Sequence, residues 1–299
     1  MLFLPIEFYI LAITCAVCRG IDPIFAKRGL ESGGNWLQNT FQTLVVRTFL
    51  AWMALFIFSN GKPMVSELSI SAIAIFGISG LIAAAFGSLL FYNGVDRMGA
   101  SVCTAITNAR PLFVVVLAVI FLGERITVGG VIGVISIVIG VILITRSKSG
   151  NVAGWKKSDL VFPLAAALLF ALGNVIRKFG FVIEPISAIQ ALAINDIAAL
   201  VGVGIYGIVT GKGGELHKGN SKSYQNFLLS GIFVFFALSA LFQALLMGPV
   251  SIADPILGTA PLFTAMIAVL LLGKVEKITK IFILGTMLII LGVVLLTGS

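Results

Sequence analysis

The stretch AITNARPLFVVVLAVIFLGERIT, residues 105–127, places Arg110 beside Pro111 in an otherwise apolar run. A guanidinium group can hold a carboxylate or another anion through two parallel hydrogen bonds. Pro111 has no backbone N–H, so the carbonyl of Thr107 loses its partner in a helix. Inside a membrane, such irregular backbone is tolerated only beside protein or a water-filled cavity. The pair therefore predicts a cavity wall that can bind an anion.

A polar stripe supports this interpretation. Ser101, Thr104, Asn108 and Pro111 recur at spacings of three, four and three, which places them on one face of a helix beside Arg110. The alternative is a proline kink packed against a neighbouring helix, with Arg110 bound to an aspartate. Both interpretations remain open on sequence alone.

Other ionisable residues also fall within apolar stretches, where a charge at mid-bilayer costs about 2.5–3.5 kcal/mol and is expected to face a cavity or a partner. Arg47 and Asp196 lie at similar depths in equivalent helices, so we expect them to pair across the two halves. Arg19 and Asp22 are three residues apart and can pair on one helix face. Each can also serve a substrate, and for Arg19 and Asp22 the structural and functional interpretations stay open.

The positions of these residues depend on the membrane helices that carry them. Hydrophobic residues make up 59% of the 299-residue chain, charged residues only 11%, and the mean hydropathy is +1.12. Apolar stretches of about 20 residues, long enough to cross a bilayer, recur along its length. We predict an all-α integral membrane protein with ten transmembrane helices, at approximately 5–27, 36–58, 69–95, 100–122, 126–145, 158–180, 185–209, 224–247, 250–272 and 278–297.

The chain is duplicated. The segment ILGTAPLFTAMIAVLLLGKVEKIT, residues 256–279, aligns with 105–127, so that Pro261 matches Pro111. Further along, Gly285 matches Gly133 and Gly292 matches Gly140. Five helices form each repeat, and an odd-numbered repeat in tandem places its second copy upside down. We expect repeats at 1–147 and 148–299, with the substrate site between them near the midplane.

Small residues in the fifth predicted helix form one face, at Gly129, Gly133 and Gly140 with Ser136 between. Such a face favours close packing of two helices in a membrane.

The distribution of basic residues predicts an orientation of the chain in the membrane. Loops after odd-numbered helices hold thirteen lysines and arginines, whereas four, Lys62, Arg125, Arg177 and Lys178, lie at the other face. The net charge of +8 therefore lies at membrane edges, where it sets orientation, and does not indicate nucleic acid. This count would place both termini outside the cell.

The ten-helix duplicated pattern, the arginine in VVRTFLAWMALFIF (45–58) and the run from Pro111 to LGERIT (122–127) resemble the EamA-type branch of the drug/metabolite transporter superfamily. The resemblance implies an α-helical carrier that moves small metabolites without ATP. It also implies termini in the cytoplasm, so the orientation stays open. The second repeat departs from the pattern, because its acidic residue, Glu276, comes two positions later than Glu124 does in the first.

The predicted function is secondary transport of small polar metabolites, such as amino acids or related carboxylates, by alternating access. The embedded arginines favour an anionic group on the substrate, and Asp22 or Asp254 can hold an amine or a coupling proton. The predicted substrate-binding residues are Arg19, Asp22, Tyr92, Asn93, Asn108, Arg110, Asn174, Gln243 and Asp254. A structural or gating role is predicted for Arg47, Asp196, Pro111 and Pro261.

Other functions fit the sequence less well. An anion or sugar-phosphate exchanger is the runner-up, and a channel is compatible with the sequence. A multidrug–proton antiporter is less favoured, because Glu7 lies near the end of the first helix. An intramembrane enzyme is disfavoured, since the chain has no HExxH or Gly-x-Ser-x-Gly motif.

We expect no metal or cofactor. The Cys15-x-x-Cys18 pair has no second pair, and His217, the sole histidine, falls in a loop. The expected partners are a small-molecule substrate, with proton coupling or exchange, and the lipid of a cell membrane that the chain crosses several times. The oligomeric state is not predicted.

Overall fold

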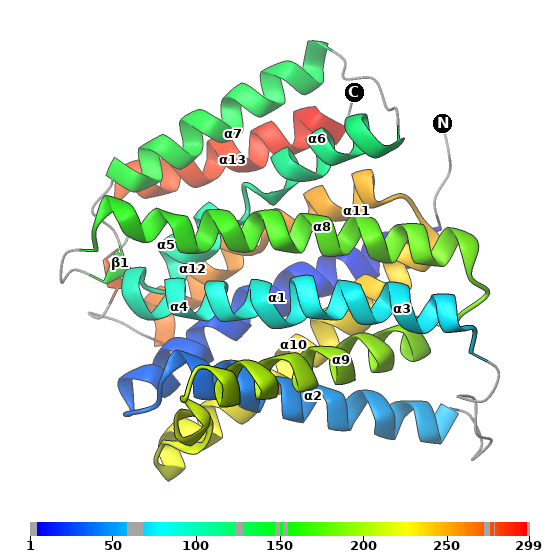
Figure 1. Cartoon of the computed structure of the whole chain (residues 1–299). Coiled ribbons are helices and arrows are strands. Elements are labelled where there is room, and N and C mark those ends of the chain that lie inside the picture. The colour runs from blue at the N-terminus through cyan, green and yellow to red at the C-terminus, as the bar shows by residue number, and fades with distance from the viewer. Residues whose placement is uncertain are drawn as a thin grey trace.

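A computed structural model describes residues 5–58, 68–122, 128–146, 150–151, 155–271, 276–277 and 279–297. These residues are helical apart from two very short strands and the connecting turns (Figure 1). The elements of the first half are α1 (Ile6–Glu31), α2 (Trp36–Phe58), α3 (Ile70–Ser79), the π-helix η1 (Gly80–Gly87), α4 (Ser88–Met98), α5 (Ala100–Thr107), α6 (Arg110–Leu122), α7 (Val128–Arg146) and β1 (Gly150–Asn151). Those of the second half are the 3₁₀ helix η2 (Lys157–Leu160), α8 (Val161–Ile183), α9 (Ala188–Val209), the 3₁₀ helix η3 (Gly213–His217), α10 (Ser221–Met247), α11 (Val250–Leu257), α12 (Ala260–Leu271), β2 (Glu276–Lys277) and α13 (Lys280–Thr297).

Six helical stretches in the described part of the chain are long and apolar enough to cross a membrane. Their bounds are Ile6–Glu31, Trp36–Phe58, Ile70–Met98, Lys157–Ile183, Ala188–Val209 and Ser221–Met247. Val128–Gly140 and Lys280–Gly292 are shorter apolar helices. Large hydrophobic side chains such as Phe49, Phe56 and Ile205 are exposed on the outer faces. A bilayer would cover these faces, so the chain is a multi-pass membrane protein.

The stretch from Ile70 to Met98 contains η1, which packs against α8 and α9. A Cβ atom added at Gly80 would lie 2.1 Å from the carbonyl oxygen of Asn195, so a larger residue would push α9 away. A Cβ atom at Gly173 of α8 would lie 2.3 Å from that of Ala83. Small residues therefore bring α8 and α9 close to η1, and with them the polar residues that these helices carry.

Two helices are broken at equivalent places in the two repeats. In the first repeat, the span predicted at 100–122 is divided into α5 and α6. The backbone N–H of Asn108 donates to the Thr104 carbonyl at 3.0 Å. In the second repeat, α11 and α12 are divided in the same way, with the N–H of Gly258 donating to the Asp254 carbonyl at 3.0 Å. The sequence suggested that Pro111 interrupts a helix. In the structure neither Pro111 nor Pro261 does so. Pro111 is instead the second residue of α6, in a first helical turn, where a missing N–H costs little.

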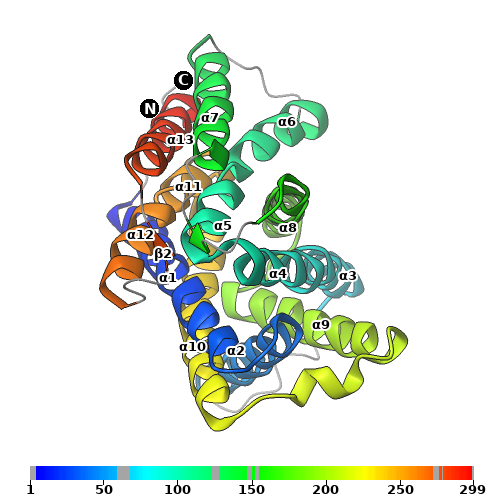
Figure 2. The ribbon, with the colours of Figure 1, turned by 90° about the vertical axis from the view of Figure 1, so that its left-hand side faces the viewer.

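The helices α7 and α13 pack closely against each other along their lengths (Figures 1 and 2). A Cβ atom added at Gly140 would lie 2.6 Å from the carbonyl oxygen of Gly285, and one at Gly292 would lie 2.5 Å from that of Gly133. Because residue numbers rise on one helix as they fall on the other, the two helices are antiparallel. Of the predicted small-residue face, Gly133 and Gly140 are confirmed at this contact, where they meet their counterparts in the second repeat.

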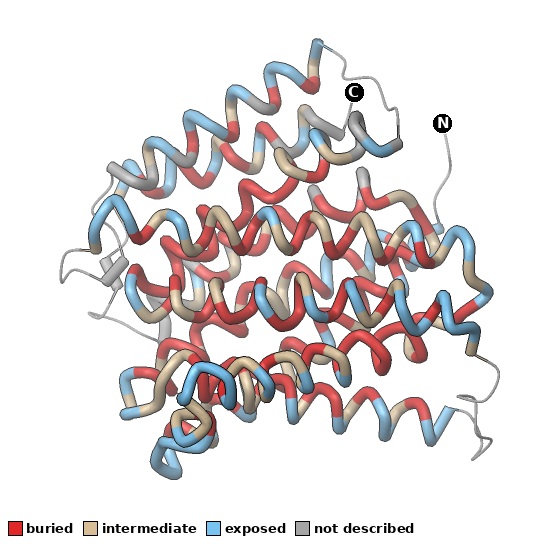
Figure 3. The backbone as a smooth tube through the Cα atoms, in the orientation of Figure 1, coloured by how far each residue is buried: buried red, intermediate tan, exposed pale blue. Residues whose placement is uncertain are grey.

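Buried residues concentrate on the helices at the centre of the molecule, whereas the outer faces of α2, α7 and α9 are exposed (Figure 3). In the central region α1 packs against α10, α11 and α12, and α8 packs against η1 and α6 (Figure 2). This centre contains residues of both repeats, so a site at the centre is formed by both halves of the chain.

The loops at one end of the bundle meet. Strand β1 pairs antiparallel with β2, with Gly150 opposite Lys277, which joins the linker between the repeats to the segment before α13. The turn between α9 and α10 lies at this same end, on the left in Figure 1. This agrees with the topology expected of an odd repeat. An inverted repeat also predicts that the segment LGERI (122–126) lies at the other end of the bundle from the segment before α13. Because Glu124, Arg125 and Lys62 lie outside the described residues, this placement stays a prediction.

Candidate functional site

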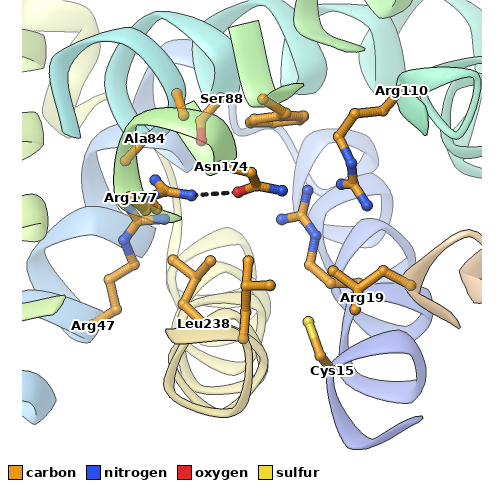
Figure 4. A pocket seen from close by; sticks show the side chains of 13 residues that line it. Cys15, Arg19, Arg47, Ala84, Ser88, Arg110, Asn174, Arg177 and Leu238 are labelled. Carbon is orange, nitrogen blue, oxygen red and sulfur yellow. Dashed lines mark hydrogen bonds between the residues drawn. The ribbon is translucent and has the colours of Figure 1, made fainter. Parts of the chain in front are cut away.

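Four arginines line one cavity at the centre of the bundle (Figure 4). Arg19 comes from α1, Arg47 from α2, Arg110 from the first residue of α6 and Arg177 from α8. Asn174 of α8 lies between the Arg177 and Arg19 side chains. The other residues lining the cavity are Cys15, Ala83, Ala84, Ser88, Phe170, Leu238, Leu241 and Leu257.

The cavity is small, with a volume of about 30 Å³. A single water requires roughly 10–15 Å³ measured in this way, so the space holds one or two waters and no metabolite. A ligand larger than water therefore fits among the four arginines only if the surrounding side chains or helices move.

Arg110 forms a buried ion pair with Asp254, the residue one turn before the break in the second repeat. Its Nε donates to Asp254 Oδ2 at 2.8 Å, and the amide of Asn174 donates to the other carboxylate oxygen at 2.8 Å. Both oxygens of this carboxylate are thus satisfied. The Nη2 of Arg110 is buried and has no hydrogen-bond partner among the described residues. Arg110 therefore lines the cavity and binds an aspartate, which combines the two interpretations that the sequence left open.

Arg47 and Asp196 form the second buried pair. Nη2 of Arg47 lies 3.0 Å from Oδ1 of Asp196, and the two side chains are 3% and 0% exposed. Since α2 belongs to the first repeat and α9 to the second, the pair joins the two halves, as the sequence predicted. Its role in structure or gating stays a prediction.

Arg177 is held by amides. Its Nε and Nη2 donate to Asn195 Oδ1 at 3.0 and 2.8 Å, and its Nη1 donates to Asn174 Oδ1 at 2.9 Å. The guanidinium also lies 4.9 Å from the centre of the Phe242 ring. Within the described part of the chain Arg177 forms no ion pair. It is therefore a buried guanidinium group with no carboxylate within ion-pair distance among the described residues.

The location of Arg177 corrects the sequence analysis, which counted it with the basic residues at a membrane face. The helix α8 continues to Ile183, so Arg177 lies well inside it and is only 3% exposed. The spacing of three between Asn174 and Arg177 was the available signal, because it places an amide and a guanidinium on one helix face.

Arg19 is the most weakly paired of the three arginines that face an aspartate. Its Nη1 is 3.9 Å from Asp22 Oδ2, and its guanidinium lies 5.5 Å from the ring centre of Phe91 and 5.2 Å from that of Phe170. Asp22 Oδ1 also accepts hydrogen bonds from Tyr92 at 2.9 Å and Ser230 at 2.5 Å. Neither Asp22 nor Tyr92 lines the cavity: Asp22 contacts Arg19, which does, and Tyr92 contacts Asp22.

A second, smaller cavity adjoins the first. It has a volume of about 20 Å³ and shares Arg19, Arg110 and Leu257 with the first. Its other lining residues are Phe91, Thr104, Thr107, Asn108 and Ala260. Asn108, a predicted binding residue, is therefore placed at the site, and Pro111 and Pro261 follow directly in the first turns of α6 and α12.

Besides Asp22, Tyr92 and Asp254, two further predicted binding residues line neither cavity. Gln243 is exposed on the outer face of α10, because its neighbours Leu241 and Phe242 occupy the buried face of that helix. Asn93 accepts a hydrogen bond from Nε of Arg97 at 2.6 Å, near the end of α4. The sequence could not separate these amides from Asn174, since all three lie in apolar helices.

Charge at the site is unbalanced. Four guanidinium groups line the cavity, whereas the carboxylates paired with them are the three of Asp22, Asp196 and Asp254. Among the described residues the group therefore carries one excess positive charge. An unpaired buried charge is costly, and an anion entering the cavity would neutralise it.

Both halves of the chain match one family of known proteins. A profile of the EamA-like transporter family matches residues 7–146 and again residues 157–298, so each half of the chain carries one copy. An uncharacterized transporter of Archaeoglobus fulgidus is 23% identical over 292 residues, covering 96% of each chain. An uncharacterized protein of Methanocaldococcus jannaschii is 29% identical over 139 residues, which are 46% of this chain and 96% of that protein. That relative is thus about one repeat long.

Two further matches are more limited. A WAT1-related protein of Arabidopsis thaliana is 34% identical over 102 residues, which are 32% of this chain and 30% of that protein. A solved structure described only as the crystal structure of a protein superposes with a TM-score of 0.63 at 15% identity, covering 94% of this chain and 95% of the other. At this identity the structural match supports the fold alone.

Proposed function

The chain belongs to the EamA-like transporter family, and on this premise we propose that it is a secondary carrier of small organic anions whose substrate site is the four-arginine cavity. The observation that carries the proposal is the excess positive charge there. Three guanidinium groups face aspartates, while Arg177 is held only by the amides of Asn174 and Asn195 and by an aromatic ring.

The charge excess also favours one class of anion. A single carboxylate brings the buried group to neutrality, whereas a phosphate dianion would leave a negative excess inside the membrane. We therefore favour substrates with one net negative charge, such as a monocarboxylic acid. An amino acid offers the same carboxylate to the guanidinium groups, but as a zwitterion it leaves the excess charge in place. The alternative is a sugar-phosphate exchanger, because the same guanidinium groups could bind a phosphate group.

The mechanism that we propose is alternating access. Residues of both repeats surround the cavity, and the two buried pairs, Arg47 with Asp196 and Arg110 with Asp254, each join one repeat to the other. Rocking of one repeat against the other would open the cavity to either side in turn. A substrate carboxylate would compete with the aspartates for the guanidinium groups, which links binding to the contacts between the halves. We place this activity in the cell membrane.

Arg177→Gln tests the proposal. Glutamine retains an amide donor for Asn174 or Asn195 but removes the charge, and no carboxylate is left without a partner. We expect a melting temperature close to that of the wild-type protein, with anion binding weakened by about 1.5–3 kcal/mol, roughly 10- to 150-fold, as for a lost hydrogen bond to a charged group. Arg97→Gln, at an exposed ion pair, serves as the control.

The measurement is a thermal-shift screen of both variants and the wild type against amino acids, hydroxy acids, keto acids and sugar phosphates, because a ligand of the folded state raises the melting temperature. Hits are then tested for uptake into proteoliposomes. Undiminished uptake by Arg177→Gln would refute the four-arginine cavity as the anion site.

A further inference from the structure

The second cavity contains hydrogen-bonding groups that the proposed anion site does not use. Arg19 and Arg110 line both cavities, so their guanidinium groups stand between the two spaces. Beyond them, the last turn of α5 contributes Thr104, Thr107 and Asn108. A ligand held by these guanidinium groups can therefore extend toward the end of α5.

The Thr104 hydroxyl is the key group. Thr104 is 3% exposed, and its Oγ1 is buried without a hydrogen-bond partner among the described residues. A buried hydroxyl without a partner is unfavourable, so a ligand group that satisfies it is stabilised there. The Thr107 hydroxyl, by contrast, already donates to the Cys103 carbonyl at 2.8 Å.

Asn108 supplies an acceptor beside Thr104. Its Nδ2 donates to the Thr104 carbonyl at 2.8 Å, and its Oδ1 accepts no hydrogen bond within the described part of the chain. This arrangement follows from the break between the two helices, because Asn108 caps the end of α5 and does not belong to α6. Thr104 and Asn108 together offer one group that donates or accepts and one that accepts.

The Thr104 hydroxyl and the Asn108 amide oxygen together favour a hydroxyl group on the ligand. A hydroxyl can donate to the Asn108 amide oxygen and accept from Thr104 at once, whereas an aliphatic chain would leave both groups unsatisfied. An ammonium group is less suited, because the guanidinium groups of Arg19 and Arg110 line the same small space and repel a cation. A second carboxylate would face the Asn108 amide oxygen.

We infer that the substrate is a small hydroxy acid, with its carboxylate in the four-arginine cavity next to Arg19 and Arg110 and its hydroxyl between Thr104 and Asn108. This inference rests on the proposed function and narrows its substrate class. It assigns Thr104 as a specificity-determining residue, one that distinguishes a hydroxy acid from the same acid without the hydroxyl.

The test compares pairs of acids that differ by one hydroxyl: glycolate with acetate, lactate with propionate, and 3-hydroxybutyrate with butyrate. Dissociation constants are measured by titration calorimetry on the purified full-length chain in one detergent. We expect the wild-type protein to prefer the hydroxy acid of at least one pair by about tenfold or more, the scale of a well-formed hydrogen bond.

Thr104→Val keeps the shape of the side chain and removes the hydroxyl. It should lower the affinity for the hydroxy acid, so that the two acids of the pair bind within about twofold of each other. The affinity for the unsubstituted acid should stay the same. Thr104→Ser should retain the preference. The matched control is Thr286→Val, since the Thr286 hydroxyl is also buried without a described partner but lines neither cavity. Thr104→Ala replaces the valine variant if that protein does not fold.

Equal affinities within every pair in the wild type would overturn the inference and leave the anion carrier standing. A preference that persists in Thr104→Val or Thr104→Ala would also overturn it. If none of the six acids binds, the hydroxy-acid inference is wrong, and the proposed function is then judged separately by the wider panel and by Arg177→Gln.

Discussion

The two broken helices of this protein have the same backbone and different chemistry. In the first repeat α5 ends at Thr107 and α6 begins at Arg110; in the second α11 ends at Leu257 and α12 begins at Ala260. Each break is closed by an N–H donating to the carbonyl four residues earlier, followed by one donating three residues back. The duplication has therefore preserved the break itself.

The side chains at the breaks differ in a complementary way. The first repeat carries a cation after its break, Arg110, where the second has Ala260. The second carries an anion before its break, Asp254, and the two meet at 2.8 Å. The comparison shows that equivalent backbone positions in the repeats were used for different purposes, so that the site is asymmetric although its scaffold is symmetric.

The largest effect is expected from Asp254→Ala, which removes the anion on one side of this comparison. Asp254 is 1% exposed and accepts from both Arg110 and Asn174, so its loss leaves a buried guanidinium without a counter-charge. Breaking a buried pair costs about 3–5 kcal/mol. We expect a large fall in melting temperature and in the yield of monodisperse protein on size-exclusion chromatography.

The double variant Arg110→Ala with Asp254→Ala sharpens the result. If the pair acts as a unit, the double variant should lose less stability than the sum of the two single variants, because neither charge is left alone. Additive losses, or an Asp254→Ala protein that melts with the wild type, would contradict the pairing.

The crossing of α7 and α13 offers the opposite case, in which the repeats are equivalent in chemistry as well as in backbone. Gly140 meets Gly285 of the other repeat, and Gly292 meets Gly133. Gly140→Leu and Gly292→Leu should each lower stability by about 1–3 kcal/mol, because a side chain there collides with backbone. Melting curves should show two losses of similar size.

Gly204→Leu on α9 is the control for this pair, because a Cβ atom there has no neighbour within 4 Å. It should leave the melting temperature nearly unchanged. Unequal losses at Gly140 and Gly292 would show that the crossing is less symmetric than its contacts indicate.

The smallest effect is expected at an exposed contact between the halves. Glu184, just after α8, accepts hydrogen bonds from Ser69 at 2.6 Å and from Ser71, both at the start of α3. These two hydrogen bonds hold the pKa of Glu184 below its ordinary value. A lowered pKa stabilises the folded protein at pH values above the ordinary pKa of glutamate. This stabilisation is lost as the pH falls through the lowered pKa.

At neutral pH, Glu184→Gln should therefore melt only about one or two degrees below the wild type. The two proteins should converge as the pH falls below about 4.3, the ordinary value for a glutamate. Glu7→Gln, at an exposed glutamate near the start of α1, serves as the control. A difference that is unchanged at acid pH would argue against a role for the two serine hydrogen bonds.

The sequence by itself determined the helical membrane architecture, the duplication and the Arg47–Asp196 contact, and it indicated the region of the helix break, a few residues from its actual place. Long apolar stretches leave a chain in lipid few alternatives to helices, and a buried charge at mid-membrane requires a partner. Equivalent helices of the two repeats reach similar depths, so the partner of Arg47 could be inferred from the alignment.

Only the tertiary structure decided which polar residues share a cavity. Periodicity shows which residues lie on one face of a helix, but not which neighbour that face meets. For this reason Asn174 and Gln243 were indistinguishable in sequence, although one contacts Asp254 and the other is exposed. Arg177 was assigned to an end because helix ends are poorly marked in apolar sequence, whereas packing of α8 against η1 and α6 carries it into the centre.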